Sequence, residues 1–309
     1  MSRPIVLVLG GGVGSERDVS IAGACAVAAA LAESGRFGVE KRIIERITAR
    51  DLAAMPGDVV FPVLHGPWGE GGPMQDLLAQ DGRAFVGAGP RAARLAMDKI
   101  ALKLVAQELG IATARAAILD PGDAECPLPP PVVVKPVREG STVGLFVCRT
   151  ADEWRDAREA AARNGRVCMV EALIEGRELT VGVVGDEPLP IIEIIPAGGL
   201  YDYDAKYARD DTAYLVEPAL PAGVAERLVA DTTRLAREVG ARHIARVDFI
   251  LDQDGAPWVL ELNTMPGFTE HSLVPMAARA RTNDPMDTPA LCARLVGLAL
   301  LERGAGVGV

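Results

Sequence analysis

Residues 246–267, RVDFILDQDGAPWVLELNTMPG, constrain the fold of this chain most strongly. The dipeptide Asp254-Gly255 favours a two-residue type I′ turn, so we expect two antiparallel strands joined there. In that register Asp248 lies directly opposite Glu261, with Cβ atoms ~5 Å apart, and facing like charges destabilise a sheet. A fold that places two carboxylates there is expected to supply a cation. Side chains alternate across a strand, so the other face of the hairpin is expected to carry the apolar residues Val247, Phe249, Leu251, Trp258, Leu260 and Leu262.

The side chains around the two acids favour a hard metal ion. Asn263 adds an amide oxygen and the stretch holds no Cys or His, so its oxygen ligands suit Mg²⁺ or Mn²⁺ rather than zinc. Arg246 would then serve a phosphate or a developing oxyanion. The alternative is an amphipathic hairpin with a solvated acidic face, which the hairpin alone does not exclude.

The composition of the whole chain limits the classes of protein that remain. The length of 309 residues suggests two or three domains, and the net charge of −10 argues against non-specific nucleic-acid binding. The five cysteines form no CxxC pair, so we expect a reducing compartment and neither a structural zinc site nor a disulfide framework. No stretch resembles a signal sequence or a transmembrane helix, so we expect a cytoplasmic protein without a membrane partner.

The first 94 residues are predicted to form a small α/β unit. A buried strand at 4–9 leads into a glycine loop and then a helix. Ser15 occupies the sixth position of a GxGxxG pattern, so a dinucleotide site is not favoured. Glu16 at the loop–helix junction is a candidate for gripping a small polar ligand, or else belongs to a helix cap. His65 follows a strand at 58–64, where open α/β sheets bind ligands, although a lone His is more often structural.

A phosphate site is predicted in the middle of the chain. Lys135 ends the buried strand 132–135, and the loop REGSTVG follows shortly after it. The glycines of this loop let backbone N–H groups face an anion, while Ser141 and Thr142 add hydroxyls. Lys99 is a second candidate cation. The alternatives are a strand-end lysine that reaches water and an ordinary turn.

After residue 95 the expected strands and helices follow no regular βα alternation, which indicates α+β packing. One helix is expected at 97–110. A second, at 150–164, carries a capping box formed by Thr150 and Glu153.

Two further features are consistent with a nucleotide site. Glu171 and Glu178 flank a loop and could receive ribose hydroxyls, while backbone groups of Ala172 and Leu173 could meet a base edge. Residues 201–214, YDYDAKYARDDTAY, contain all four tyrosines of the chain, which argues against plain disorder and predicts a lid over a ligand.

Seven stretches run in order along nearly the whole chain: ERDVS, VLHG, MDK, VVKPVREGSTVG, YDYDAKY, ARVDF and LELNTMPGFTEHSLVP. Together they resemble the D-alanine–D-alanine ligases of the ATP-grasp superfamily, and YDYDAKY and ELNTMPGFTEHS are the most specific of them. The resemblance implies an α/β and α+β chain with the ATP-grasp fold. An N-terminal Rossmann-like α/β domain (1–94, substrate-binding) would precede two α+β domains that sandwich ATP. These are a central domain (95–178) and a catalytic, metal-binding domain (179–309) with a lid at about 200–215.

The resemblance also implies roles for individual residues. Two Mg²⁺ or Mn²⁺ ions would be held by Asp248, Glu261 and Asn263. ATP would be bound by Lys99, Lys135, Gly140, Ser141, Thr142, Val143, Glu171, Ala172, Leu173, Ile174, Glu178 and Lys206. The two amino-acid substrates would contact Glu16, His65, Tyr201, Lys206, Tyr207, Arg246, Gly267, Ser272 and Leu273. The catalytic set would be Glu16, Ser141, Tyr207 and Arg246, with Arg246 stabilising the oxyanion of the tetrahedral intermediate.

The implied activity joins two D-alanines in a homodimeric enzyme of peptidoglycan synthesis. ATP would convert one carboxylate into an acyl phosphate, and the amine of the second amino acid would displace phosphate. The alternatives are D-lactate or D-serine as second substrate, or another ATP-grasp carboxylate–amine ligase. A metal-dependent hydrolase or nuclease that uses Asp248 and Glu261, and a non-enzymatic nucleotide-binding module, belong to different classes.

Overall fold

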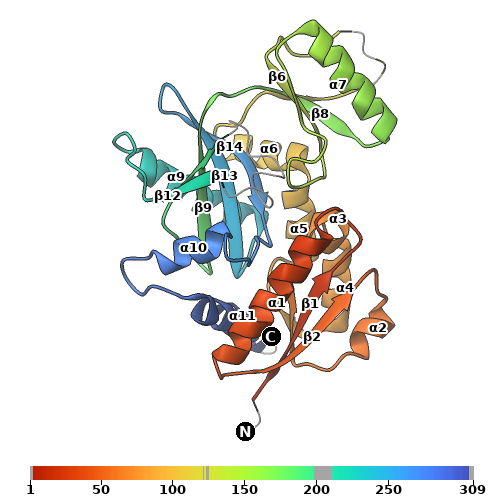
Figure 1. Cartoon of the computed structure of the whole chain (residues 1–309), viewed down its shortest axis with the longest axis vertical. Helices are drawn as coiled ribbons and strands as arrows, with labels where there is room; N and C mark the ends of the chain where they lie inside the picture. The colour runs from red at the N-terminus through yellow and green to blue at the C-terminus, as the bar shows by residue number, and fades with distance from the viewer. Residues whose placement is uncertain (1–2, 121, 123–124, 198–210, 306–309) are drawn as a thin grey trace.

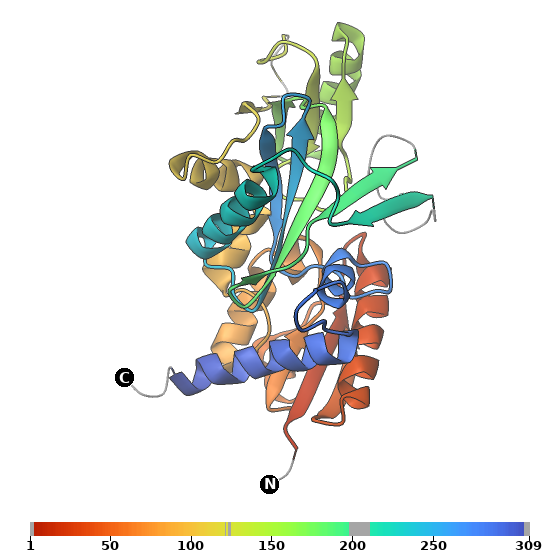
Figure 2. The ribbon, with the colours of Figure 1, turned by 90° about the vertical axis from the view of Figure 1, so that its left-hand side faces the viewer.

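The computed structural model of the chain describes residues 3–120, 122, 125–197 and 211–305. Within these ranges three β-sheets are stacked along the long axis of the molecule (Figure 1). The N-terminal sheet lies at one end, the sheet of residues 116–172 lies at the other, and the third sheet lies between them (Figures 1 and 2). None of the helices in the described ranges combines enough length and apolar character to cross a membrane.

The N-terminal sheet is parallel, and helices cover both of its faces. Its strands are, in spatial order, β2 (Gly38–Ile44), β1 (Ile5–Gly11), β3 (Val59–Pro62) and β4 (Ala84–Phe85). Its helices are α1 (Arg17–Glu33), α2 (Ala49–Ala53), α3 (Gly66–Gly69), α4 (Pro73–Asp81) and α5 (Pro90–Met97). Both faces of β1 are buried, because Val6 and Val8 pack toward α1 while Leu7 and Leu9 pack toward α2 and α4.

The C-terminal helices pack against this N-terminal unit. The last helix, α11 (Thr288–Ala305), lies beside α1, and α10 (Leu273–Arg279) joins it to the third sheet (Figures 1 and 2). Val27 of α1 and Leu291 of α11 belong to one continuous cluster of buried apolar side chains. The two ends of the sequence therefore share a core.

The second sheet is antiparallel and carries one long helix. Its strands are, in spatial order, β5 (Ala116–Ile118), β8 (Cys168–Ala172), β6 (Val132–Pro136) and β7 (Phe146–Cys148). Helix α7 (Ala151–Asn164) covers one face through Trp154. The capping box predicted from Thr150 and Glu153 is confirmed, and Gly165 ends the helix in the left-handed conformation.

The third sheet forms the floor of the site. Its strands are, in spatial order, β12 (Thr212–Val216), β11 (Ile192–Pro196), β9 (Gly176–Val184), β13 (Ile244–Asp252) and β14 (Pro257–Asn263), with β10 (Glu187–Pro188) paired to β9. Helices α6 (Lys99–Glu108) and α9 (Val224–Val239) cover one face and bury Val247 and Phe249. Because side chains alternate, Asp248 and Glu261 lie on the opposite face.

The turn between β13 and β14 differs from the expected one. Asp252 N–H donates to the Ala256 carbonyl (3.0 Å), which leaves a three-residue loop at 253–255. Gly255 has a φ of 79°, whereas Asp254 has no positive φ. A type I′ turn needs positive φ at both central residues, so the prediction of a two-residue turn was wrong.

A β-bulge restores the predicted pairing farther along the hairpin. Phe249 pairs with Val259, yet Asp248 pairs with Glu261, so Leu260 is the additional residue on β14. The predicted register of the acid pair is therefore confirmed, although the register near the turn was wrong by one residue. The bulge also changes the core face: Val259 is 2% exposed, whereas Trp258 and Leu260, predicted to be core residues, are only partly buried.

Two other element boundaries differ from the sequence prediction. The helix expected at 97–110 is present as α6, which Asp98 caps by accepting a hydrogen bond from Ala101 N–H (3.0 Å), and only its expected first residue, Met97, belongs instead to α5. The end of the expected lid is a strand, since β12 pairs with β11 and contains Tyr214. The rest of the lid, with Tyr201, Lys206 and Tyr207, lies outside the described residues.

Candidate active site

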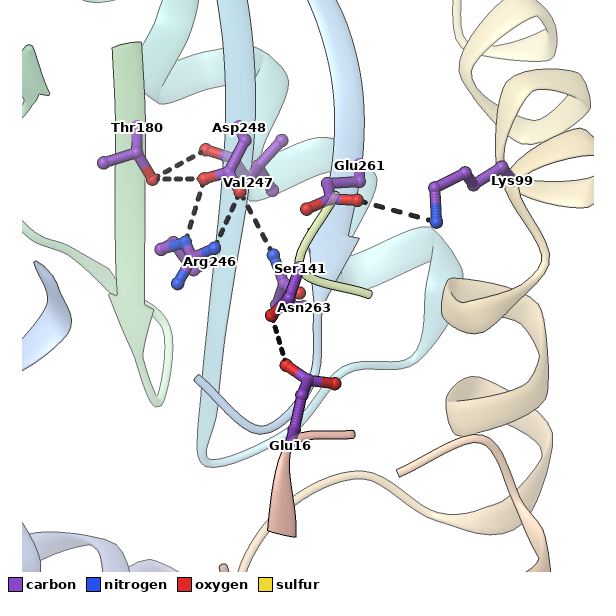
Figure 3. Close-up of polar contacts among 9 residues, drawn as sticks. All are labelled: Glu16, Lys99, Ser141, Thr180, Arg246, Val247, Asp248, Glu261 and Asn263. Carbon is purple, nitrogen blue, oxygen red and sulfur yellow. Dashed lines mark hydrogen bonds and ion pairs between the residues drawn. The ribbon is translucent and has the colours of Figure 1, made fainter. Parts of the chain in front are cut away.

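The Asp248 carboxylate is held by side chains from three neighbouring strands. Arg246 donates through Nε (2.9 Å) and Nη2 (2.8 Å) to its two oxygens, as Figure 3 shows. Thr180 Oγ1 of β9 donates to Oδ1 (2.6 Å), and Asn263 Nδ2 of β14 donates to Oδ2 (3.2 Å). Asp248 is only 5% exposed, so these bonds fix its orientation on the floor of the site.

Glu261 faces a lysine on the other side. The Nζ of Lys99, at the first turn of α6, lies 3.7 Å from Glu261 Oε2 and donates to the Glu139 carbonyl (2.5 Å). Arg246 and Lys99 therefore offset the repulsion between the two carboxylates.

The oxygen atoms around this pair of acids fit a hard divalent metal ion. In the described part of the chain, no group of three or more His, Cys, Asp or Glu side chains gathers that could hold a metal. The oxygen-bearing side chains here are Asp248 and Glu261, with the Asn263 amide beside them (Figure 3). Two carboxylates with space for water and phosphate are the usual protein contribution to Mg²⁺ binding.

A cavity of about 830 Å³ opens between the second and third sheets. This volume is within the range of small-molecule sites. The predicted ATP-binding residues that line it are Lys99, Lys135, Gly140, Thr142, Val143, Glu171, Ala172, Leu173, Ile174 and Glu178. Of the remaining two, Ser141 lines a neighbouring cavity, and Lys206 lies outside the described residues.

Apolar walls of the large cavity were missed by the sequence reading. Val133 and Val147 come from the second sheet, and Ile194 and Ile250 come from the third. A flat aromatic base could be held between two such walls. The run VVV at 132–134 could have indicated such a wall, because continuous apolar residues are typical of a strand with both faces covered.

The loop that follows β6 bends toward the N-terminal unit. Ser141 (φ 51°) and Thr142 (φ 62°) both adopt the left-handed conformation, which costs non-glycine residues free energy. Ser141 Oγ donates a hydrogen bond to Glu16 Oε1 (Figure 3). A Cβ at Gly140 would lie 3.0 Å from Glu16 Oε2, so this close approach favours glycine. Two members of the implied catalytic set, Glu16 and Ser141, are therefore in contact, and a third member, Tyr207, lies outside the described residues.

A second, narrow cavity of about 70 Å³ adjoins the first. The predicted substrate-binding residues that line it are Glu16, His65, Arg246, Gly267, Ser272 and Leu273. Gly140 and Glu261 line both cavities, so the two spaces meet at these residues. The described part of the site thus brings together residues of the N-terminal unit and of the other two sheets.

Glu70 is a residue of the small cavity that the sequence reading missed. Its Oε1 accepts a hydrogen bond from Gly66 N–H (3.1 Å) and lies 3.9 Å from His65 Nδ1. Burial, together with repulsion from the Glu16 carboxylate, raises the pKa of Glu70 to about 8. Burial also lowers the pKa of His65. In the sequence, the one local sign of this residue is an acidic side chain directly after the segment HGPWG.

We expect Glu70 to make stability depend on pH. Its pKa in the folded chain (about 8) is above the ordinary value of 4.5, so folding favours the protonated acid. That contribution is complete below the ordinary pKa and is lost as the pH rises through about 8. Glu70→Gln keeps an acceptor for Gly66 and does not titrate. The melting temperature of this variant minus that of wild type should therefore be larger at about pH 9 than at about pH 5.

Thermal unfolding of both proteins at the two pH values checks this expectation. Glu45→Gln is the matched control, because Glu45 is exposed in a loop of the same unit. An unchanged difference between Glu70→Gln and wild type at the two pH values would show that Glu70 ionises normally.

The side chain of Glu171 does not fit the ribose role predicted for it. One oxygen lies 2.8 Å from Lys103 Nζ, and the other forms an ion pair with Lys135. The residue is 3% exposed, so its carboxylate is occupied by two lysines rather than open to ribose hydroxyls. Glu178 remains the acidic candidate for the ribose.

Comparisons with known proteins agree with one another. The family described as "D-ala D-ala ligase C-terminus" matches residues 122–297. The D-alanine–D-alanine ligase of Dechloromonas aromatica is 40% identical over 299 residues, which cover 95% of this chain and 97% of that protein. The D-alanine–D-alanine ligase of Bordetella pertussis is 43% identical over an alignment that covers 88% of this chain and 89% of that protein. The crystal structure of the Bacillus anthracis ligase complexed with ATP has a TM-score of 0.83 at 29% identity, covering 99% of this chain and 100% of that one.

Proposed function

The chain belongs to the D-alanine–D-alanine ligase family, and from this premise we propose that it joins two D-alanines at the expense of ATP. It is an ATP-dependent ligase, and its products would be ADP, phosphate and D-alanyl-D-alanine for peptidoglycan synthesis. One observation carries the assignment: a nucleotide-sized cavity and a small polar cavity meet at Gly140 and Glu261. A phosphoryl group held in the first can reach a carboxylate held in the second.

We propose that the large cavity binds ATP with its phosphates toward this junction. Lys99 and Lys135 line this cavity, and the loop that contains Gly140 would cover the phosphates. When bound, two Mg²⁺ or Mn²⁺ ions on Asp248, Glu261 and Asn263 would neutralise negative charge on the phosphates. The ribose would lie near Glu178, and the base would lie between the apolar walls.

The small cavity is proposed to hold the amino acids. Glu16 would receive the ammonium of the first D-alanine beside His65, and its bond to Ser141 would close the loop over the site. Ser272 and Leu273, at the start of α10, would bind the carboxylate of the second D-alanine. Gly267 leaves room beside them, because a Cβ at this position would lie only 2.8 Å from Ser272 Oγ. Excluding water matters here, because water would hydrolyse the acyl phosphate.

Arg246 is proposed to stabilise the oxyanion that forms when the amine attacks. It lines the small cavity, and its bidentate bond to Asp248 fixes the orientation of its guanidinium. A preorganised cation at the point of developing charge is the largest single contribution that such a site makes to the rate.

The remaining features stay predictions of the proposal. These are the domain borders after residues 94 and 178, the lid at about 200–215 with Tyr201, Lys206 and Tyr207, the homodimer and the cytoplasmic location. Sedimentation of the purified chain would decide the oligomeric state, where a monomer would contradict the homodimer.

An assay of phosphate release from ATP and Mg²⁺ tests the function. We expect release with D-alanine, accompanied by D-alanyl-D-alanine, and little release with L-alanine or without an amino acid. D-lactate or D-serine supplied together with D-alanine tests the alternative second substrates. Release that needs no amino acid, or that is equal with L-alanine, would contradict the ligase assignment and favour a hydrolase.

A further inference from the structure

Lys103 is a buried lysine for which the proposed reaction has no role so far. It lies on α6, one turn after Lys99, and is only 5% exposed. Its Nζ donates to Thr113 Oγ1 (2.8 Å) and to the Ala114 carbonyl (3.0 Å), and it lies 2.8 Å from Glu171 Oε2. A lysine is seldom buried so completely unless its charge is paired, so Glu171 is its essential partner.

Glu171 connects this lysine to the nucleotide cavity. Its other oxygen forms an ion pair with Lys135, which lines the cavity and is 8% exposed. Two ammonium groups therefore share one carboxylate, and the three side chains together carry a charge of +1. Without Lys103 the remaining Glu171–Lys135 pair would be neutral.

We propose that Lys103 is a positioning residue for the nucleotide phosphates. By sharing Glu171 it leaves a net positive charge at Lys135 and holds the Lys135 ammonium at the wall of the cavity. This role rests on the proposed function, because it requires the cavity to bind ATP. The surroundings are largely desolvated, so one unit of charge here acts more strongly on a phosphate than it would in water.

The competing explanation is purely structural. Lys103 also ties α6 to the connection at 113–114, and Thr113 Oγ1 donates onward to the Val259 carbonyl of β14 (3.2 Å). If this were its only role, its removal would loosen the whole cavity. Binding of the nucleoside and of the nucleotide would then weaken together, whereas loss of charge affects only ligands with phosphates.

Calorimetric titration with Mg²⁺–ATP and with adenosine separates the two explanations. For Lys103→Met we expect the Kd for ATP to rise about tenfold, while the Kd for adenosine changes less than about twofold. In the double variant Lys103→Met/Glu171→Gln, Lys135 regains an uncompensated charge, so most of the ATP affinity should return. Lys41→Met is the matched control, because Lys41 is exposed on β2, far from the cavity.

Any other result of these titrations contradicts the proposal. Equal losses for ATP and adenosine would mean a structural role only, and a double variant weaker than the single one would contradict the charge argument. If Lys103→Met does not fold, Lys103→Gln, which keeps a donor for Thr113 and Ala114, carries the same test. Wild-type protein that binds ATP no better than adenosine would refute the proposed function itself, whereas failure confined to the variants would refute only the role of Lys103.

Discussion

Replacing Glu261 with glutamine should leave the chain folded while kcat falls by about 10³-fold. The amide has nearly the shape of the carboxylate, and Glu261 is only partly buried, so the hairpin can keep its register. The change removes one of the two negative charges proposed to hold the metal ions, at the point where both cavities meet. Steady-state turnover with saturating ATP, together with circular dichroism, measures both parts of this expectation.

The control for this variant is Asp254→Asn. It makes the same chemical change at an exposed position in the turn of the same hairpin, and should leave kcat unchanged. Raising the Mn²⁺ concentration should recover part of the lost activity of Glu261→Gln if the defect is in metal binding. A Glu261→Gln protein with wild-type turnover would show that this carboxylate has no role in the reaction.

Removing the guanidinium of Arg246 should lower kcat by about 10²- to 10³-fold, the usual cost of losing one donor to an oxyanion. ATP binding should change less, because Arg246 lines the small cavity rather than the large one. Arg246→Met also takes two hydrogen bonds from Asp248, which keeps its bonds to Thr180 and Asn263. The measurement is kcat set beside the Kd for Mg²⁺–ATP.

Two further variants make the result specific. Arg246→Lys keeps the charge but loses the planar fork that binds both oxygens of Asp248, so an intermediate kcat is expected. Arg237→Met removes an exposed arginine near the end of α9 and should have no effect. If Arg246→Met weakened ATP binding as much as turnover, Arg246 would be holding the metal–nucleotide site together rather than stabilising the oxyanion.

The hairpin shows how far local sequence reasoning reaches. The assumed two-residue turn placed Asp248 opposite Glu261, alternation placed both on one face, and the pairing is confirmed. The turn type was wrong, because Asp-Gly also suits a three-residue loop in which only the glycine needs a positive φ. A bulge at Leu260 compensates for that error, and nothing in the local sequence distinguishes a bulged strand from a regular one.

The parts of the site that were not foreseen depend on contacts between distant segments. Lys103 meets Glu171 only in the folded chain, because 68 positions separate the two residues in the sequence. Glu70 acquires its raised pKa because it is buried near Glu16, which comes from a different loop. Lys103 lies in no stretch whose own pattern marks it as functional, and the local signal for Glu70 is limited to its place directly after HGPWG.

Residue order was sufficient to predict most strands and helices and the side chains that carry the proposed chemistry. Strand alternation, glycine loops and cap residues act within a few positions of each other, so the acid pair, the lysine-bearing strand and the capped helix could be located from residue order alone. Three properties became visible only in the folded chain: which charges share a carboxylate, which acid is buried and where the two cavities join. Those properties depend on distance and desolvation in three dimensions, and both are set by how the three sheets pack.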